Sequence, residues 1–213
     1  IIVTGLFITY SVNAQQLKIF SENKSQGFII YGSNPELYHM SISLDLDIKN
    51  LAFSEKERKV FVIPPNSDKF KIGELTIIET GGRIKFSYTY KSAFGDVTLT
   101  GFDSRFEYDL PFQKGKSYKV YQGYNGSFSH KNQNAIDFTM AEGTEILTAR
   151  DGIIVQLVQN NTESCPREDC RKYNNYITVM HNDGTFANYS HIRYNGSVYK
   201  LGDPVKKGVV IAY

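Results

Sequence analysis

The feature that most constrains the fold is a strict alternation of apolar and polar residues in two stretches of the chain. In "HMSISLDLDI" every second residue from Met40 to Ile48 is apolar, and serines and aspartates lie between them. "RIKFSYTY" repeats the pattern from Ile84 to Tyr90. A period of two is typical of a β-strand with one buried face and one solvated face. Both stretches therefore predict strands of an antiparallel sheet.

Further strand candidates are "GFIIYG", "KVFVIP" and "GELTIIE", separated by the turn-rich "GSNPE", "PPNSD" and "TGG". Several short strands within residues 15–110 predict a small β-sandwich. Near "YDLPFQKGKSY" the pattern changes, and we place a domain boundary at Leu110–Pro111. Residues 111–213 again contain short apolar strands, broken by Asp-Gly, Asn-Gly and Gly-Asp turns. The sequence thus predicts an all-β chain of two domains.

The N-terminal residues predict export. "IIVTGLFITYSVNAQQ" is uncharged and largely apolar, and small residues precede the cleavage point that we place after Ala14. Residues 1–14 would then be the remnant of a signal peptide; an ordinary buried strand is the alternative. The run is shorter than the roughly 20 apolar residues of a transmembrane helix, so we expect no stable membrane span. A periplasmic, cell-surface or secreted location follows.

Charge and cysteines limit the classes of partner. The formal net charge of +2 on 213 residues is too small to indicate nucleic acid as the main partner. Cys165 and Cys170 lie in the polar segment "ESCPREDC" and could form a disulfide in an oxidising compartment, or remain two free thiols. They are poor zinc ligands, because two further partners at suitable spacing are not evident.

The stretch "SHKNQNAIDFTM" places His130 seven positions before Asp137. The alternation in "AIDFTM" directs Asp137 away from its apolar neighbours, and the Gly-rich "GYNGSFSH" can fold back towards it. One interpretation is a surface loop followed by a core strand. The other is a pair of metal ligands, one imidazole nitrogen and one carboxylate oxygen. The spacing alone leaves both open.

A second histidine-bearing stretch, "YITVMHNDGTFANYSHI", predicts a hairpin with Asp183–Gly184 as a two-residue loop. This register pairs Thr178 with Tyr189. Tyr189 and His191 then lie on one face of the hairpin, and His181 lies on the other. We therefore expect His181 and His191 to serve different sites.

These stretches together resemble the lysostaphin/LytM-type zinc endopeptidases, which cut cross-links in bacterial peptidoglycan. The resemblance covers residues 118–213 and includes, in order, the His…Asp pair, "GTEILTARDGIIV", "HNDGTFANYSHI" and "LGDPVKKGVVIAY". It implies a compact antiparallel β domain whose sheet forms a groove with zinc on its floor. The upstream β domain is similar, more loosely, to the all-β N-terminal part of some exported members.

The resemblance implies a role for each matching residue. His130 and Asp137 match zinc ligands, His191 matches a catalytic histidine that does not bind the metal, and His181 receives no catalytic role. Tyr189 is a candidate donor to the oxyanion, with a packed hairpin tyrosine as the alternative. The family's third ligand, in an H-x-H motif, would follow the last residue, Tyr213. The polypeptide as it stands is therefore expected to bind zinc poorly and to be inactive.

The implied function is hydrolysis of amide bonds in peptidoglycan peptide stems by a water molecule that zinc activates. The first alternative is a non-catalytic LytM-like protein that binds cell wall or regulates another hydrolase. The second is a biotinyl/lipoyl-type module, to whose hairpin "LGDPVKKGVVIA" is also similar. Those modules need a Met-Lys pair at a hairpin tip, and this sequence has none.

Overall fold

The structure, a computed structural model, describes residues 17–103, 105–163 and 172–213. Nearly all of its regular elements are β-strands in antiparallel sheets, which confirms the predicted fold class. The chain forms two compact units, one ending at Thr100 and one beginning at Gly101. The predicted signal-peptide remnant, residues 1–14, and the predicted Cys165–Cys170 disulfide lie outside the described residues.

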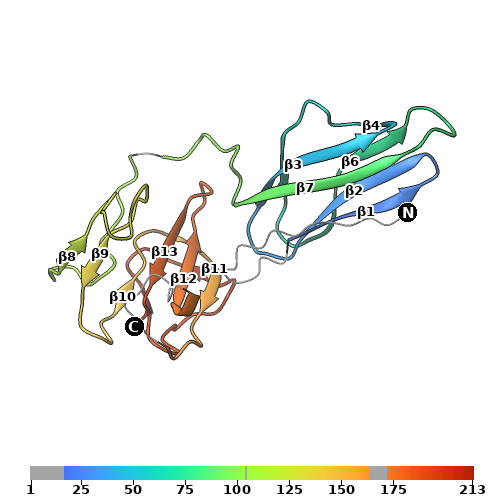
Figure 1. Cartoon of the computed structure of the whole chain (residues 1–213). Coiled ribbons are helices and arrows are strands. Elements are labelled where there is room, and N and C mark those ends of the chain that lie inside the picture. Colours follow the sequence, from blue (N-terminus) through green and yellow to red (C-terminus); the bar gives the residue numbers. More distant parts are fainter. Residues whose placement is uncertain (1–16, 104, 164–171) are drawn as a thin grey trace. The chain divides into compact units, whose positions relative to one another are not determined.

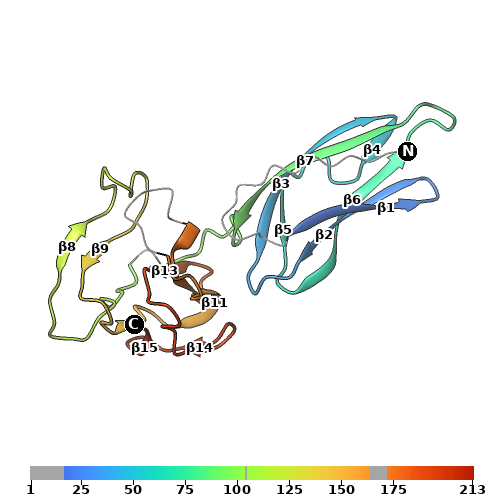
Figure 2. The ribbon, with the colours of Figure 1, turned by 60° about the horizontal axis from the view of Figure 1, so that its bottom comes forward.

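The first unit contains two antiparallel sheets (Figures 1 and 2). One has the strand order β1-β2-β6-β4 and the other β5-β3-β7. The strands are β1 (Lys18–Lys24), β2 (Gly27–Asn34), β3 (Met40–Lys49), β4 (Leu51–Phe53), β5 (Val60–Ile63), β6 (Ser67–Ile77) and β7 (Lys85–Phe94).

The core of this unit lies between the two sheets. Phe28 of β2 packs on Phe86 of β7, with ring centroids 5.2 Å apart, so side chains from both sheets meet face to face. The predicted inward positions Met40 and Ile42 are 0% and 1% exposed, while Asp45 on the opposite face is exposed. Burial of one face of each sheet against the other is the β-sandwich arrangement that the alternation predicts.

A buried asparagine ties the end of β2 to two other chain segments. The Asn34 Nδ2 atom donates to the carbonyl oxygens of Tyr38, Ile63 and Pro64 at 2.8, 3.2 and 2.9 Å. Its Oδ1 atom accepts the amide of Glu36 at 3.1 Å. Asn34 is fully buried. One side chain therefore satisfies several backbone groups that water cannot reach.

The second unit contains one four-stranded sheet, β13-β12-β11-β14, and two short two-stranded sheets, β10-β15 and β8-β9. No helix among the described residues is long and apolar enough to cross a membrane. The strands are β8 (Lys119–Gln122), β9 (Asp137–Thr139), β10 (Ile146–Leu147), β11 (Gly152–Val158), β12 (Tyr176–Met180), β13 (Phe186–Ser190), β14 (Pro204–Val205) and β15 (Val210–Ala212). The core of the unit is formed by Ile154, Ile177, Val179, Tyr189, Ile192, Val205, Ile211 and Ala212.

The register of the β12–β13 hairpin differs from the predicted one. Tyr189 pairs with Ile177 and not with Thr178. The Gly184 amide donates to the carbonyl of His181 at 3.0 Å, and Gly184 has a φ of 79°. A glycine in the left-handed region closes a three-residue loop in place of a two-residue one. The prediction that His181 and Tyr189 lie on opposite faces of the hairpin is therefore wrong. His181 directly follows β12 and lies on the same face as Tyr189.

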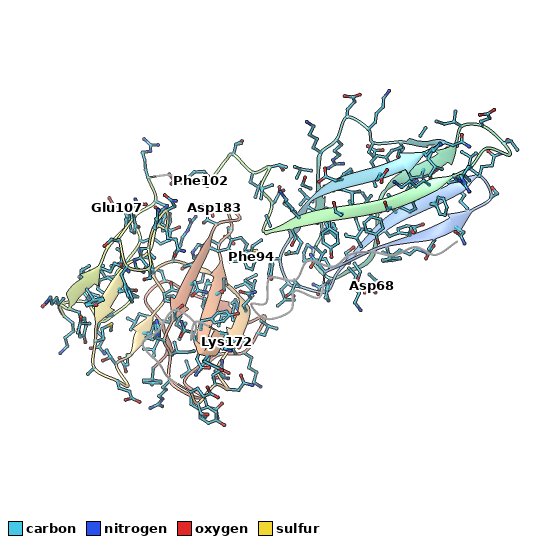
Figure 3. The ribbon with its side chains drawn as sticks, viewed as in Figure 1. Asp68, Phe94, Phe102, Glu107, Lys172 and Asp183 are labelled. Atoms are coloured by element: carbon cyan, nitrogen blue, oxygen red, sulfur yellow. The ribbon has the colours of Figure 1, made fainter. Side chains whose placement is uncertain are left out.

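Residues 105–110 pack on the second unit, so the predicted boundary at Leu110–Pro111 lies inside that unit. The amide of Asp109 donates to the carbonyl of Ala149 at 3.0 Å. The guanidinium of Arg150 lies 3.9 Å from the ring centroid of Phe106. It also forms a 2.8 Å ion pair with Asp183, which lies at the tip of the β12–β13 hairpin (Figure 3).

Candidate metal centre

The β8–β9 hairpin and its long connection bring His130 and Asp137 together. Gln122, the last residue of β8, pairs with Asp137, the first residue of β9. The connection between them turns sharply around His130, whose amide donates to Gly126 O at 3.2 Å and whose carbonyl accepts from Gln133 at 2.8 Å. The loop therefore returns His130 to the end of β9 where Asp137 lies.

The two side chains meet at the rim of the unit. The His130 Nε2 atom lies 3.3 Å from the Asp137 Oδ1 atom. The imidazole is 8% exposed, whereas the Asp137 side chain is 40% exposed. A buried histidine does not fit the surface-loop interpretation of this stretch. The arrangement combines a shielded imidazole with a carboxylate that remains open to solvent.

A backbone contact fixes the tautomer of the neutral His130 imidazole. It decides that the ring nitrogen facing Asp137 carries a lone pair. The His130 Nδ1 atom lies 3.1 Å from the carbonyl oxygen of Gly123, which can only accept a hydrogen bond. In the neutral ring, Nδ1 therefore carries the hydrogen and Nε2 presents its lone pair to the carboxylate. Two acceptor atoms this close require a cation or a proton between them. Histidines that bind metals commonly donate their other N–H to such a carbonyl.

The pair fits two ligands of one zinc ion. Imidazole nitrogen and carboxylate oxygen are both zinc ligands, and two ligand atoms of a tetrahedral zinc lie roughly 3.3–3.4 Å apart. The observed separation is 3.3 Å. Within residues 17–103, 105–163 and 172–213, no group of three or more His, Cys, Asp or Glu side chains is arranged to hold a metal. The described residues thus include two side chains that could serve as ligands, whereas a catalytic zinc site uses three.

Gln122, which the sequence patterns did not single out, contacts both sides of this pair. Its Nε2 atom donates to the Asp137 Oδ2 atom at 3.3 Å and to the Ser129 hydroxyl at 2.8 Å. Its Oε1 atom accepts the amides of Phe128 at 3.0 Å and Ser129 at 3.2 Å. The residue is 8% exposed. A glutamine that ends a strand has no signature of its own, so only the folded hairpin shows these contacts.

His191 directly follows β13 and is exposed. Its φ of 65° lies in the left-handed region, and its amide donates to the carbonyl of Asn175 at 2.9 Å. A non-glycine residue in this region is uncommon, although histidine is among the residue types that adopt it more readily. In the part of the chain that the structure describes, His191 belongs to no metal-binding group of three or more side chains. Its catalytic role stays a prediction.

Tyr189 is a packed residue of the core, 8% exposed. Its hydroxyl oxygen accepts the amide of Ala149 at 2.8 Å. Burial raises the pKa of Tyr189, and the hydrogen bond from Ala149 opposes that shift. These contacts fit a tyrosine that is packed in the hairpin. They do not test whether its hydroxyl donates a hydrogen bond to an oxyanion.

His181 is a second buried histidine, 2% exposed. Its Nδ1 atom lies 2.8 Å from the carbonyl oxygen of Asp151, so the hydrogen is on Nδ1. Among the residues that the structure describes, the buried Nε2 atom has no hydrogen-bond partner. Burial lowers the pKa of His181, and the nearby Arg150 guanidinium lowers it further, although the Asp151 carbonyl and the Asp183 and Asp151 carboxylates oppose this. The folded state therefore holds His181 neutral.

The free energy of unfolding is expected to fall below about pH 6.5 because of His181. An unfolded histidine takes up a proton near pH 6.5, whereas the folded residue does so only at lower pH. Acidification between these two values therefore favours the unfolded state, by at most roughly 1.4 kcal/mol per pH unit. Urea unfolding of the second unit, followed from pH 8 to pH 5, measures the slope.

The matched variant for this measurement is His181→Asn, whose amide can still donate to the Asp151 carbonyl but does not titrate. Its stability should depend less on pH below 6.5 than that of the parent protein. Equal slopes in the two proteins would show that His181 does not carry the effect.

Comparison with known families matches part of this unit. The model of Peptidase family M23 matches residues 131–213. The matched segment begins one residue after His130 and includes Asp137, Tyr189 and His191. No curated protein and no solved structure matches the chain. The second unit thus contains a segment, residues 131–213, that is similar to Peptidase family M23.

Proposed function

We propose that the protein is a zinc endopeptidase that cleaves peptide cross-links of bacterial peptidoglycan, with His130 and Asp137 as two of the zinc ligands. The observation that carries the proposal is the 3.3 Å approach of His130 Nε2 to Asp137 Oδ1 at the start of a segment that matches a peptidase family. The contact of His130 Nδ1 with the Gly123 carbonyl supports it, because it directs the free lone pair to the carboxylate.

When bound, zinc supplies a Lewis acid and lowers the pKa of a coordinated water to about 7. The other tasks fall to residues of the chain. The exposed imidazole of His191 can accept the proton of the attacking water, or donate a hydrogen bond to the oxyanion that develops on the scissile carbonyl. The exposure of Asp137 leaves the site accessible to a peptide stem.

Peptidoglycan lies outside the cytoplasmic membrane, so this function requires export. The apolar N-terminal residues 1–14 support export as the remnant of a signal peptide. The first unit, a β-sandwich without an evident catalytic cluster among its described residues, would serve as a spacer or targeting module.

The proposal concerns a polypeptide that includes the third zinc ligand, here called the full-length protein. It is tested by incubating this protein with purified peptidoglycan and measuring newly released amino groups. Release is expected to stop when a chelator removes the metal and to resume when Zn²⁺ is restored. His191→Ala should keep its zinc and lose about 10²–10⁴-fold in rate, because only proton transfer is removed. Release of reducing sugars without amino groups, or cleavage that a chelator does not affect, would overturn the proposal.

A second candidate function is binding of cell wall without cleavage, with which the match of residues 131–213 to a peptidase family model is also compatible. Such a protein would sediment with peptidoglycan and release no amino groups at any zinc concentration. The same incubation therefore separates the two functions.

A further inference from the structure

We propose that Gln122 is the positioning residue of the metal centre. Its single side-chain amide fixes the orientation of the Asp137 carboxylate and the position of the His130 imidazole. The inference rests on the proposed zinc site and deepens it. Gln122 occupies the end of β8, opposite Asp137, and its side chain is buried. Its Nε2 atom donates to both sides of the pair, and its Oε1 atom accepts from the histidine side.

On the aspartate side, Gln122 determines which carboxylate oxygen is free. Its Nε2 atom donates to Asp137 Oδ2 at 3.3 Å, while Asp137 Oδ1 lies 3.3 Å from His130 Nε2. The two oxygens therefore have different partners. A carboxylate held through one oxygen presents the other in a fixed direction, which lowers the entropy lost when a metal binds.

On the histidine side, Gln122 holds the loop immediately before His130. Its Oε1 atom accepts the amides of Phe128 and Ser129 at 3.0 and 3.2 Å, and its Nε2 atom donates to the Ser129 hydroxyl at 2.8 Å. Ser129 is the residue that precedes His130. Without these bonds Phe128 and Ser129 would lose their attachment to β8, and only the contact of His130 Nδ1 with the Gly123 carbonyl would still orient the imidazole towards Asp137.

Gly126 gives independent evidence that the loop is built around Gln122. A Cβ atom added at Gly126 would lie 2.2 Å from the Gln122 Cγ atom and 2.7 Å from its Cδ atom. Real Cβ atoms do not approach this closely, so any larger residue at position 126 would displace the Gln122 side chain. The absence of a side chain at Gly126 therefore makes room for the glutamine.

The direct test is Gln122→Met in the full-length protein, with Co²⁺ and Zn²⁺ as the probes. Methionine fills a similar volume but makes none of the four hydrogen bonds. We expect the dissociation constant for either metal to rise about 10–100-fold, as for other groups that orient metal ligands. The visible absorption spectrum of the Co²⁺-loaded protein should also change, because the geometry of the metal ligands changes. A purely structural role of Gln122 would leave that geometry, and the spectrum, intact.

Gly126→Ala tests the same inference without altering the glutamine, since the new methyl group should push Gln122 aside. It should weaken metal binding and change the Co²⁺ spectrum in the same direction as Gln122→Met. Gly101→Ala is the matched control, because an added Cβ there meets nothing within 4 Å. If Gln122→Met fails to fold, Gln122→Asn keeps the amide but is one methylene too short, and at least a fivefold loss of affinity is expected.

The outcomes separate this inference from the proposed function. Parent protein that binds neither metal overturns both. Suppose instead that the parent protein binds metal and that the folded Gln122→Met and Gly126→Ala variants bind it with the same affinity and spectrum. This result would overturn the role of Gln122 and leave the proposed function standing. Variants with lower melting temperatures but unchanged affinity and spectrum below those temperatures would likewise show that Gln122 is only structural.

Discussion

In the full-length protein, replacing His130 or Asp137 by alanine is expected to abolish tight zinc binding and to reduce peptidoglycan cleavage to background. Each variant removes one of the two ligand atoms that approach to 3.3 Å. A catalytic zinc uses three protein ligands, and the loss of one leaves too few to hold the ion against dilution. Zinc content after dialysis and the rate of amino-group release are the two measurements.

The matched controls for these variants are His39→Ala and Asp45→Ala, which remove an exposed histidine and an exposed aspartate from the first unit. Both should keep the zinc content and cleavage rate of the parent protein. A His130→Ala or Asp137→Ala protein that retained stoichiometric zinc would show that the ion is held elsewhere.

Replacing Asn34 by alanine is expected to produce the largest loss of stability in the first unit. The side chain makes four hydrogen bonds to backbone groups and is fully buried. Removing it leaves buried carbonyls and an amide without partners, at a cost of about 2–4 kcal/mol. The measurement is hydrogen exchange of amides in β2 and β5, which these bonds connect, and in β3, which pairs with β5.

Exchange within the second unit should remain unchanged in Asn34→Ala, which makes that unit an internal reference. Asn23→Ala, on the exposed edge of β1, is the control of matched chemistry and should shift the opening free energy by less than about 0.5 kcal/mol. Equal exchange in the Asn34 and Asn23 variants would contradict the account of the buried asparagine.

The strands of the first unit could be predicted from the sequence because their alternation is local. The alternation from Met40 to Ile48 is a property of the local sequence and does not depend on other parts of the chain. The structure has β3 at Met40–Lys49. The approach of His130 to Asp137 was also predictable, through a resemblance in several ordered motifs. The spacing alone is only a weak signal and favoured the surface loop.

The hairpin register could not be predicted, because a side chain decides it. Asp183 Oδ1 accepts the amide and the hydroxyl of Thr185 at 3.1 and 2.6 Å, which places Asp183 within the turn and lengthens the loop by one residue. The dipeptide Asp183–Gly184 is compatible with either loop length. Side-chain contacts of this kind are visible only in the folded chain.

The unit boundary and the role of Gln122 depend on contacts distant in sequence. The predicted boundary placed residues 105–110 in the N-terminal domain, but they join the second unit, where Phe106 packs on Arg150 and Asp109 bonds to Ala149. Gln122 reaches Asp137 across fifteen residues of chain. Neither arrangement leaves a periodic or compositional signal.

The most direct test of the metal centre is the anomalous X-ray signal at the zinc absorption edge from crystals of the full-length protein grown with Zn²⁺. The account predicts one strong peak within bonding distance of both His130 Nε2 and Asp137 Oδ1, roughly 2.0–2.2 Å from each, with the imidazole of His191 facing the ion without binding it. A peak at another site with none between His130 and Asp137, or a peak ligated by His191 in place of either residue, would contradict it.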